Sequence, residues 1–117
     1  MYQIGASADG NAALAGGVNE MPPQLKGQFV IWATGSGHQT AFQNGAWVEE
    51  LLEKWLEGSG FPEVIDEVKA NEVYSDWWET LEISTKVGRC YYPTVFWGGW
   101  YDIFGQEVRR ASAPARP

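Results

Sequence analysis

Two short, continuously apolar runs constrain the fold of this chain more than any other feature. They cover residues 29–34 and 94–97, and both are rich in β-branched and aromatic side chains. A strand buried on both faces of a parallel sheet has this composition, because it has no polar face to alternate with. A long block with helical spacing separates the two runs. Strands that alternate with helices predict an α/β fold.

The block between the runs is typical of a helical cap inserted over a sheet. Residues 47–56 place apolar side chains on one stripe of a predicted helix. Pro62 suits the first turn of a second helix, and Ser75 is a candidate cap for a short third one. We therefore expect three helices between the two strands.

The segment before the first run predicts a turn and a helix. Residues 1–4 look like the end of a strand, and residues 11–15 favour a helix that Gly16-Gly17 should stop. The tail after Gln106 has too few apolar residues to join a core. The predicted organisation is an α/β core at residues 1–43, a helical cap at 44–90, a core strand and the segment that contains Asp102 at 91–106, and a disordered tail at 107–117.

Charge and composition exclude several classes of function. The net charge of −7, from 8 basic and 15 acidic residues, disfavours binding to nucleic acid. No apolar run is long enough for a membrane span, and no basic-then-apolar leader opens the chain, so we expect no membrane partner and take the cytoplasm as the default location. The single cysteine, Cys90, excludes an internal disulfide. Spacings typical of metal ligands are missing, so no metal is expected.

A serine flanked by small residues stands between the strand end and the helix start, in Gly5-Ala6-Ser7-Ala8-Asp9-Gly10. A nucleophile elbow needs this composition, because its serine lies on a sharp, strained turn where bulky neighbours would clash. Such a turn exposes the serine hydroxyl and directs the next backbone N–H toward an oxyanion. The alternative interpretation, a helix-capping serine or a phosphate-binding loop, is common for a short motif of this kind.

An aspartate follows the second apolar run, in Gly98-Gly99-Trp100-Tyr101-Asp102. Working residues of open α/β sheets lie beyond the carboxyl ends of parallel strands. An aspartate that comes after the serine in chain order fits the acid of a Ser–Asp–His triad, which holds an imidazole in one tautomer. The alternative is an aspartate that only closes a turn.

Taken together, Gly5-x-Ser7-x-x-Gly10 and the Gly-Gly-Trp-Tyr-Asp-Ile-Phe segment at 98–104 resemble the cocaine esterase / α-amino-acid ester hydrolase / X-prolyl dipeptidyl peptidase family. The resemblance covers about residues 2–106 and implies an α/β-hydrolase with an inserted helical cap. It implies Ser7 as the nucleophile, the Ala8 N–H as half of the oxyanion hole, and Asp102 as the triad acid. It implies a small ester or peptide substrate and no cofactor.

Three departures from the family pattern bear on activity. Ala8 replaces the usual aromatic residue, and Asp9 brings a charge close to the elbow. The family's histidine follows the acid, whereas the only histidine here, His38, precedes it. We therefore expect an incomplete hydrolase that is inactive by itself. Its strands should expose unpaired edges and apolar faces, which predicts poor solubility or a homo-oligomer.

Four further residues are candidates for lining a substrate pocket: His38, Trp77, Trp78 and Trp100. A rival interpretation comes from the seven tryptophans, which also fit a small, non-catalytic, aromatic-rich binding module. The separation of Ser7 from the Asp102 carboxylate distinguishes the two. A gap of about 7–10 Å, which admits one imidazole with a hydrogen bond on either side, favours the hydrolase.

Overall fold

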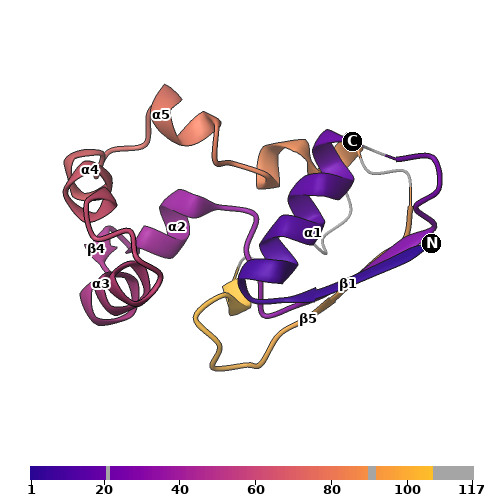
Figure 1. The fold of residues 1–117 in the computed structure, drawn as a ribbon, viewed down its shortest axis with the longest axis horizontal. Helices are drawn as coiled ribbons and strands as arrows, with labels where there is room; N and C mark the ends of the chain where they lie inside the picture. The colour runs from indigo at the N-terminus through magenta and orange to yellow at the C-terminus, as the bar shows by residue number, and fades with distance from the viewer. Residues whose placement is uncertain (21, 90–91, 107–117) are drawn as a thin grey trace. The chain divides into compact units, whose positions relative to one another are not determined.

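A computed structural model of the chain describes residues 1–20, 22–89 and 92–106 (Figure 1). The chain divides into two units. The first consists of Met1–Ser36 and the chain from Glu82 onward, and the second is Gly37–Leu81. The predicted cap, residues 44–90, overlaps most of the second unit. The tail predicted to be disordered, residues 107–117, lies outside the described residues, as does Cys90.

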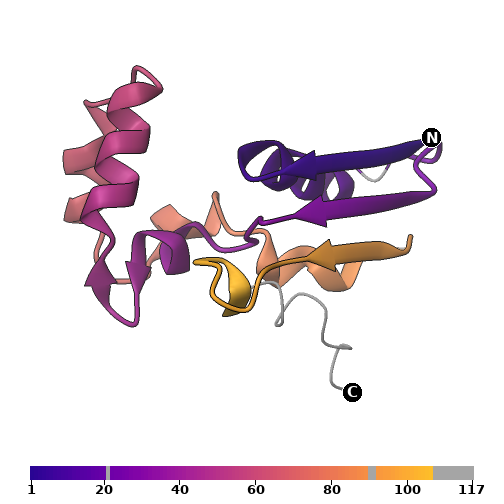
Figure 2. The same cartoon turned by 90° about the horizontal axis from the view of Figure 1, so that it is seen from below.

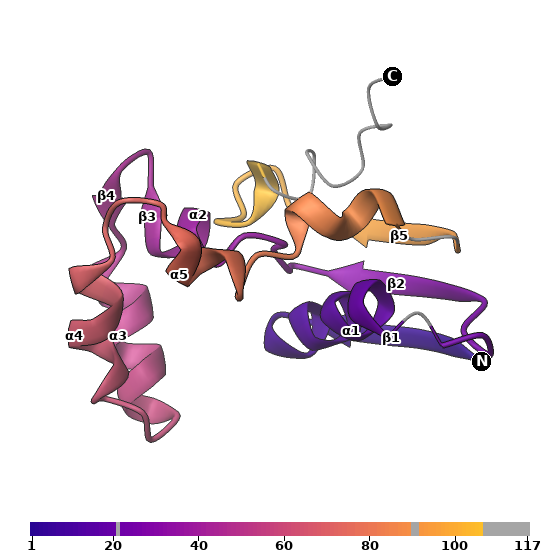
Figure 3. The same cartoon turned by 90° about the horizontal axis from the view of Figure 1, so that it is seen from above.

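A parallel sheet forms the centre of the first unit. Its strands are β1 (Tyr2–Ala6), β2 (Gly27–Ile31) and β5 (Thr94–Trp97), in the order β1-β2-β5. The register aligns Ala6 with Ile31 and Ile31 with Trp97, so all three strands end together (Figure 3). The predicted α/β class is confirmed, with this three-stranded parallel sheet and five α-helices among the described residues.

The first apolar run forms a strand, but the strand ends earlier than the run. Its composition predicts extended backbone to Thr34, whereas β2 stops at Ile31. Trp32 has a φ of 46°, which lies in the left-handed region, so the extended conformation cannot continue through it. The segment after Ile31 therefore leaves the sheet, although its residues are apolar.

Helix α1 (Ala8–Asn19) packs against β1 and β2 and covers one face of the sheet. Leu14 and Val18 of this helix and Val30 of β2 are the most deeply buried large side chains among the described residues. The predicted stop at Gly16-Gly17 is wrong, because the helix runs through both glycines. Packing explains Gly17: a Cβ there would lie 2.3 Å from the Tyr92 hydroxyl oxygen.

Gly17→Ala is expected to lower the free energy of unfolding by about 1–3 kcal/mol, the usual cost of overpacking a core. The added methyl would also meet Gln28 Nε2 at 2.5 Å, and Gln28 is a buried side chain already hydrogen-bonded to the Ala13 carbonyl and to Gln3. The matched control is Gly16→Ala, where nothing lies within 4 Å of the new Cβ. Urea unfolding followed by tryptophan fluorescence should show a loss for Gly17→Ala and a gain for Gly16→Ala, and equal effects would contradict this packing.

The opposite face of the sheet is open among the described residues, so the prediction of burial on both faces holds for only one of them. Tyr2 is 81% and Ile4 70% exposed on β1, and Trp97 is 59% exposed on β5. A groove of about 550 Å³ lies on this open face toward the amino-terminal end of the strands, lined by residues such as Tyr2, Phe29 and Val95. It therefore lies at the end of the strands that is remote from Ser7 and Asp102.

The second unit consists of four helices and a short hairpin: α2 (Gly37–Ala41), β3 (Phe42–Gln43), β4 (Ala46–Trp47), α3 (Glu49–Gly58), α4 (Val64–Ala70) and α5 (Asp76–Glu79). The three helices expected between the strands correspond to α3, α4 and α5. Trp47 differs from the prediction, because it pairs with Phe42 in the hairpin and the helix begins at Glu49. Positive φ values at Asn44 and Gly45 give the hairpin its tight turn.

The two chain connections to the second unit are joined to each other within the first unit. The Gly35 carbonyl accepts hydrogen bonds from the backbone N–H groups of Ile83 (2.7 Å) and Ser84 (2.9 Å). The Ser36 hydroxyl donates to Glu82 at 2.9 Å, and the Ser84 hydroxyl donates to the other oxygen of that carboxylate. Glu82 is only 2% exposed, and Ser84 begins the 3₁₀ helix η1 (Ser84–Arg89). These contacts fix the point where the second unit leaves and rejoins the first.

Candidate functional site

Ser7 has the backbone of a strained turn. It follows β1 directly, precedes α1, and has a φ of 54° and a ψ of −124°. A residue other than glycine pays about 1–3 kcal/mol for such a conformation. An ordinary capping serine has extended backbone and a side-chain bond to the helix, whereas Ser7 makes no side-chain capping bond. The geometry therefore fits a nucleophile elbow and differs from that of a common helix cap.

Backbone hydrogen bonds hold the strained turn from both sides. The Ser7 N–H donates to the Ile31 carbonyl at 2.9 Å, and the Asn11 N–H donates to the Ser7 carbonyl at 3.0 Å. The Asn11 side chain in turn accepts from the Thr34 N–H at 2.8 Å. Because these bonds join the turn to β2 and to the segment after it, the Ser7 hydroxyl stays at the exposed edge of the sheet.

The two glycines of the motif stand where no side chain fits. A Cβ on Gly5 would lie 2.4 Å from the Asp9 carbonyl oxygen. A Cβ on Gly10 would lie 2.7 Å from the Cβ of Ala33. Asp9, which departs from the common G-x-S-x-G pattern, is exposed. The close approach of helix to sheet thus falls at Gly10, one position later than in that pattern.

Ala8 is the first residue of α1. The first N–H groups of a helix have no partner within the helix, and the helix dipole adds partial positive charge there. The Ala8 N–H is therefore a suitable donor to an oxyanion that forms on a group bound to Ser7.

Asp102 lies in a turn beyond the carboxyl end of β5. The turn is closed by bonds from the Asp102 N–H to the Gly99 carbonyl (3.2 Å) and from the Gly105 N–H to the Asp102 carbonyl (2.9 Å). One carboxylate oxygen, Oδ1, accepts from the Phe104 N–H at 3.1 Å. The other, Oδ2, is buried and has no hydrogen-bond partner among the described residues. Burying a carboxylate oxygen without a hydrogen-bond partner lowers the stability of the fold, so we expect a hydrogen-bond donor to bind at this atom.

The strands β1, β2 and β5 end at the same edge of the sheet (Figure 2), where Ser7 directly follows β1 and Asp102 comes five residues after the end of β5. One strand, β2, separates β1 from β5. The ends of β1 and β5 are therefore about 10 Å apart, which is two strand spacings. Ala8 and the exposed Trp100 belong to the same unit as Ser7 and Asp102.

The other predicted pocket residues, His38, Trp77 and Trp78, lie together in the second unit. The His38 ring is 5.2 Å from that of Trp78, and Trp78 is 4.6 Å from Trp77. The Nε2 of His38 is hydrogen-bonded to the Glu72 carbonyl at 2.8 Å. Trp78 is buried in the aromatic core of this unit with Phe42. The His38 side chain is therefore held by contacts within the second unit.

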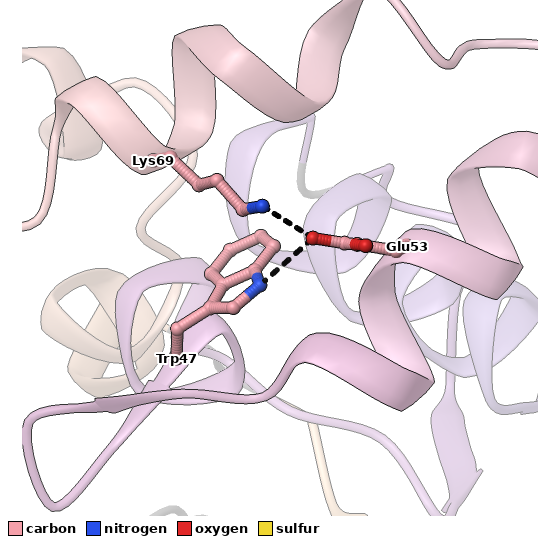
Figure 4. A network of polar contacts seen from close by, with 3 residues as sticks. All are labelled: Trp47, Glu53 and Lys69. Carbon is pink, nitrogen blue, oxygen red and sulfur yellow. Dashed lines mark hydrogen bonds and ion pairs between the residues drawn. The ribbon is translucent and has the colours of Figure 1, made fainter.

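A polar network ties three elements of the second unit together (Figure 4). The Trp47 indole N–H donates to Glu53 at 3.3 Å, and the Lys69 ammonium pairs with the same carboxylate oxygen. The Lys69 ammonium also lies 5.3 Å from the Trp47 ring centre. The hydrogen bond from Lys69 lowers the pKa of Glu53, and the same bond raises the pKa of Lys69. The arrangement is an ion pair that stabilises packing between β4, α3 and α4.

Sequence reasoning missed one residue at the edge of the sheet, Trp32. It follows β2 directly and has a positive φ. In the sequence it continues an apolar run, so nothing distinguishes it from a further strand residue. Only its positive φ distinguishes Trp32 from the strand residues that precede it.

Several classes of site find no support in the part of the chain that the structure describes. Residues 1–20, 22–89 and 92–106 contain no group of three histidine, cysteine or carboxylate side chains placed to hold a metal ion. Over the same ranges, every helix is too short or too polar for a membrane crossing. Compared with protein-family profiles and with curated proteins, the chain matches none.

Proposed function

We propose that this chain carries the nucleophile and the acid of a serine hydrolase with an α/β-hydrolase core and an inserted helical cap. The observation that carries the proposal is Ser7, which has a φ of 54° and makes no capping bond. Folding does not require this conformation of a serine, whereas an elbow does. The resemblance of residues 98–104 to the acid segment of the cocaine esterase and X-prolyl dipeptidyl peptidase family supports Asp102 as the acid.

The reaction would be acyl transfer from a small ester or peptide. Ser7 Oγ attacks the carbonyl carbon while an imidazole base accepts the hydroxyl proton. The Ala8 N–H stabilises the oxyanion, and the imidazolium returns the proton to the leaving alcohol or amine as that bond breaks. Water then attacks the acyl-enzyme, and its proton passes through the imidazole to Ser7. The unpartnered Oδ2 of Asp102 would accept the N–H of that imidazole and fix its tautomer.

The rival function, a non-catalytic aromatic binding module, has less support. Its aromatic side chains would have to face solvent in a shared surface. Trp77 and Trp78, however, belong to the aromatic core of the second unit, so these two tryptophans do not contribute to such a surface. The strained serine and the unpartnered carboxylate also have no role in such a module.

Labelling with a fluorophosphonate probe tests the proposal. The site as described has no imidazole at Asp102, so the full chain should label slowly in plain buffer. Adding imidazole to the buffer should accelerate labelling at Ser7, by about tenfold or more, because general-base catalysis contributes about 10²–10⁴-fold when the base is well placed. Ser7→Ala is the matched control and should remain unlabelled.

The outcomes separate the candidates. Imidazole-dependent labelling at Ser7, located by mass spectrometry, supports the hydrolase. Equal labelling of the wild type and Ser7→Ala, or no labelling at any imidazole concentration, would overturn it.

A further inference from the structure

The strained backbone of Ser7 needs a support that its own hydrogen bonds do not give. The Ser7 N–H donates to the Ile31 carbonyl, which continues the pairing of β1 with β2. The Ser7 carbonyl accepts from the Asn11 N–H, which is the first hydrogen bond of α1. Neither bond requires a positive φ, because a capping residue with extended backbone also accepts the first bond of its helix. Since strained conformations persist only where the surrounding structure imposes them, a further contact must hold the start of α1.

The Asn11 side chain provides this contact. Its Oδ1 accepts the Thr34 N–H at 2.8 Å, so the first turn of α1 is bonded to the segment after β2. Thr34 is only 5% exposed, and a buried N–H that loses its acceptor destabilises the arrangement that buries it. The helix also lies close to this segment, since a Cβ on Gly10 would be 2.7 Å from the Cβ of Ala33. A shift of the helix start away from the segment would break the bond from Thr34.

The donor of this bond belongs to a segment that is itself fixed. The Thr34 hydroxyl accepts from the Ser36 N–H at 2.9 Å and donates to the Ser36 carbonyl at 3.1 Å. The Ser36 hydroxyl donates to the Glu82 carboxylate at 2.9 Å, and Thr34, Ser36 and Glu82 are all buried. Because Asn11 is bonded to a buried and hydrogen-bonded segment, it can fix the turn that carries Ser7.

We propose that Asn11 is a positioning residue that keeps Ser7 in the strained conformation of an elbow. Without the bond to Thr34, the first turn of α1 can move. Ser7 can then take extended backbone and cap the helix with its hydroxyl, as serines at this position commonly do. Asn11 thus decides whether Ser7 is an elbow or a cap. The catalytic part of the inference, that the same bond aligns the Ser7 hydroxyl and the Ala8 N–H for attack, rests on the proposed function.

The one-bond Cα–Hα coupling constant of Ser7, measured by NMR on the ¹³C-labelled full chain, tests the conformational part. This coupling is smaller at positive than at negative φ, so the wild type should give a value below that of an ordinary serine. Asn11→Ala, which removes the acceptor, should raise it by several hertz to the ordinary value. Asn11→Asp keeps an oxygen acceptor and should keep the wild-type value. Asn71→Ala is the matched control, because it removes an asparagine side chain that is hydrogen-bonded to the Glu67 carbonyl in the second unit.

Fluorophosphonate labelling in imidazole-containing buffer tests the catalytic part. Asn11→Ala should be labelled at Ser7 about tenfold to a hundredfold more slowly than the wild type, because a displacement of about 1 Å can cost a hundredfold in rate. Asn11→Asp should retain most of the rate. If the wild type is unlabelled, the proposed function fails, and the coupling constant still decides whether Asn11 holds the turn.

Several results would overturn the inference. One is an ordinary Ser7 coupling in the wild type, and another is a folded Asn11→Ala variant whose Ser7 coupling equals that of the wild type. If neither Asn11→Ala nor the similarly sized Asn11→Leu folds, the fold rather than the elbow requires Asn11, and the positioning role is wrong. A changed coupling with an unchanged labelling rate would likewise refute the catalytic part.

Discussion

Gly5→Ala is expected to destabilise the chain by roughly 3 kcal/mol, at the upper end of the usual cost of overpacking. The new Cβ would lie 2.4 Å from the Asp9 carbonyl oxygen, 2.6 Å from the Asp9 carbonyl carbon and 2.8 Å from the Gly10 nitrogen. All three are backbone atoms of α1, so no side-chain rotation can relieve the clash. The helix would have to move away from β1, and the strained turn at Ser7 would open with it.

Urea unfolding monitored by tryptophan fluorescence measures this effect. Gly58→Ala is the matched control, because nothing lies within 4 Å of a Cβ at that position. The control should unfold at nearly the wild-type midpoint, whereas Gly5→Ala should unfold at a much lower urea concentration. A Gly5→Ala variant as stable as the wild type would mean that α1 does not approach β1 as closely as described.

Asp102→Asn is expected to reduce imidazole-dependent ester hydrolysis by roughly a hundredfold or more, as loss of the acid does in serine hydrolases with a complete triad. The physical reason lies in Oδ2, which is buried and has no partner among the described residues. A carboxylate there accepts an imidazole N–H and stabilises the imidazolium, whereas an amide does neither well. The Asp102 Oδ1 bond to the Phe104 N–H can survive in the variant, so the turn should keep its shape.

The measurement is the rate of 4-nitrophenyl acetate hydrolysis against imidazole concentration, corrected for the reaction of imidazole alone. Asp66→Asn, an exposed position in α4, changes the net charge equally and should leave the rate unchanged. Comparable rates for wild type and Asp102→Asn would remove Asp102 from the catalytic role. Because the proposed reaction uses Ser7 as the nucleophile, Ser7→Ala provides the baseline.

The sequence predicts the three parallel strands and most of the helices because these depend on local patterns, but it does not predict the β3–β4 hairpin. The apolar run at 29–34 overlaps β2, the run at 94–97 coincides with β5, and the stripe at 47–56 overlaps α3. Gly16-Gly17 misled the prediction, since a glycine pair usually ends a helix. Here Gly17 instead makes room for Tyr92 and Gln28, which are distant in sequence. A contact between residues so far apart in the chain cannot be recognised from the local sequence around Gly17.

The residues of the candidate site also differ in whether the sequence predicts them. Motif and chain order predict Ser7, Ala8 and Asp102 as site residues, and the register of the sheet brings the strands before them to one edge. Their catalytic roles remain predictions. Composition does not distinguish Trp32, because its distinguishing feature is a positive φ. Side-chain chemistry predicts His38, Trp77 and Trp78 as pocket residues, and in the second unit the Trp78 ring contacts those of the other two.

The buried Glu82 carboxylate has a consequence for how this chain tolerates change. Its hydrogen bonds to Ser36 and Ser84 hold the two ends of the segment Gly37–Leu81 close together, so this segment is a loop whose ends already meet. The entropy of closing such a loop grows only slowly with its length, by about 0.6 kcal/mol for each doubling. The sheet and α1 should therefore accept a shorter, longer or foreign segment between Ser36 and Glu82. The segment between Ser36 and Glu82 should therefore be replaceable, provided that the hydrogen bonds from Ser36 and Ser84 to the buried Glu82 carboxylate are kept.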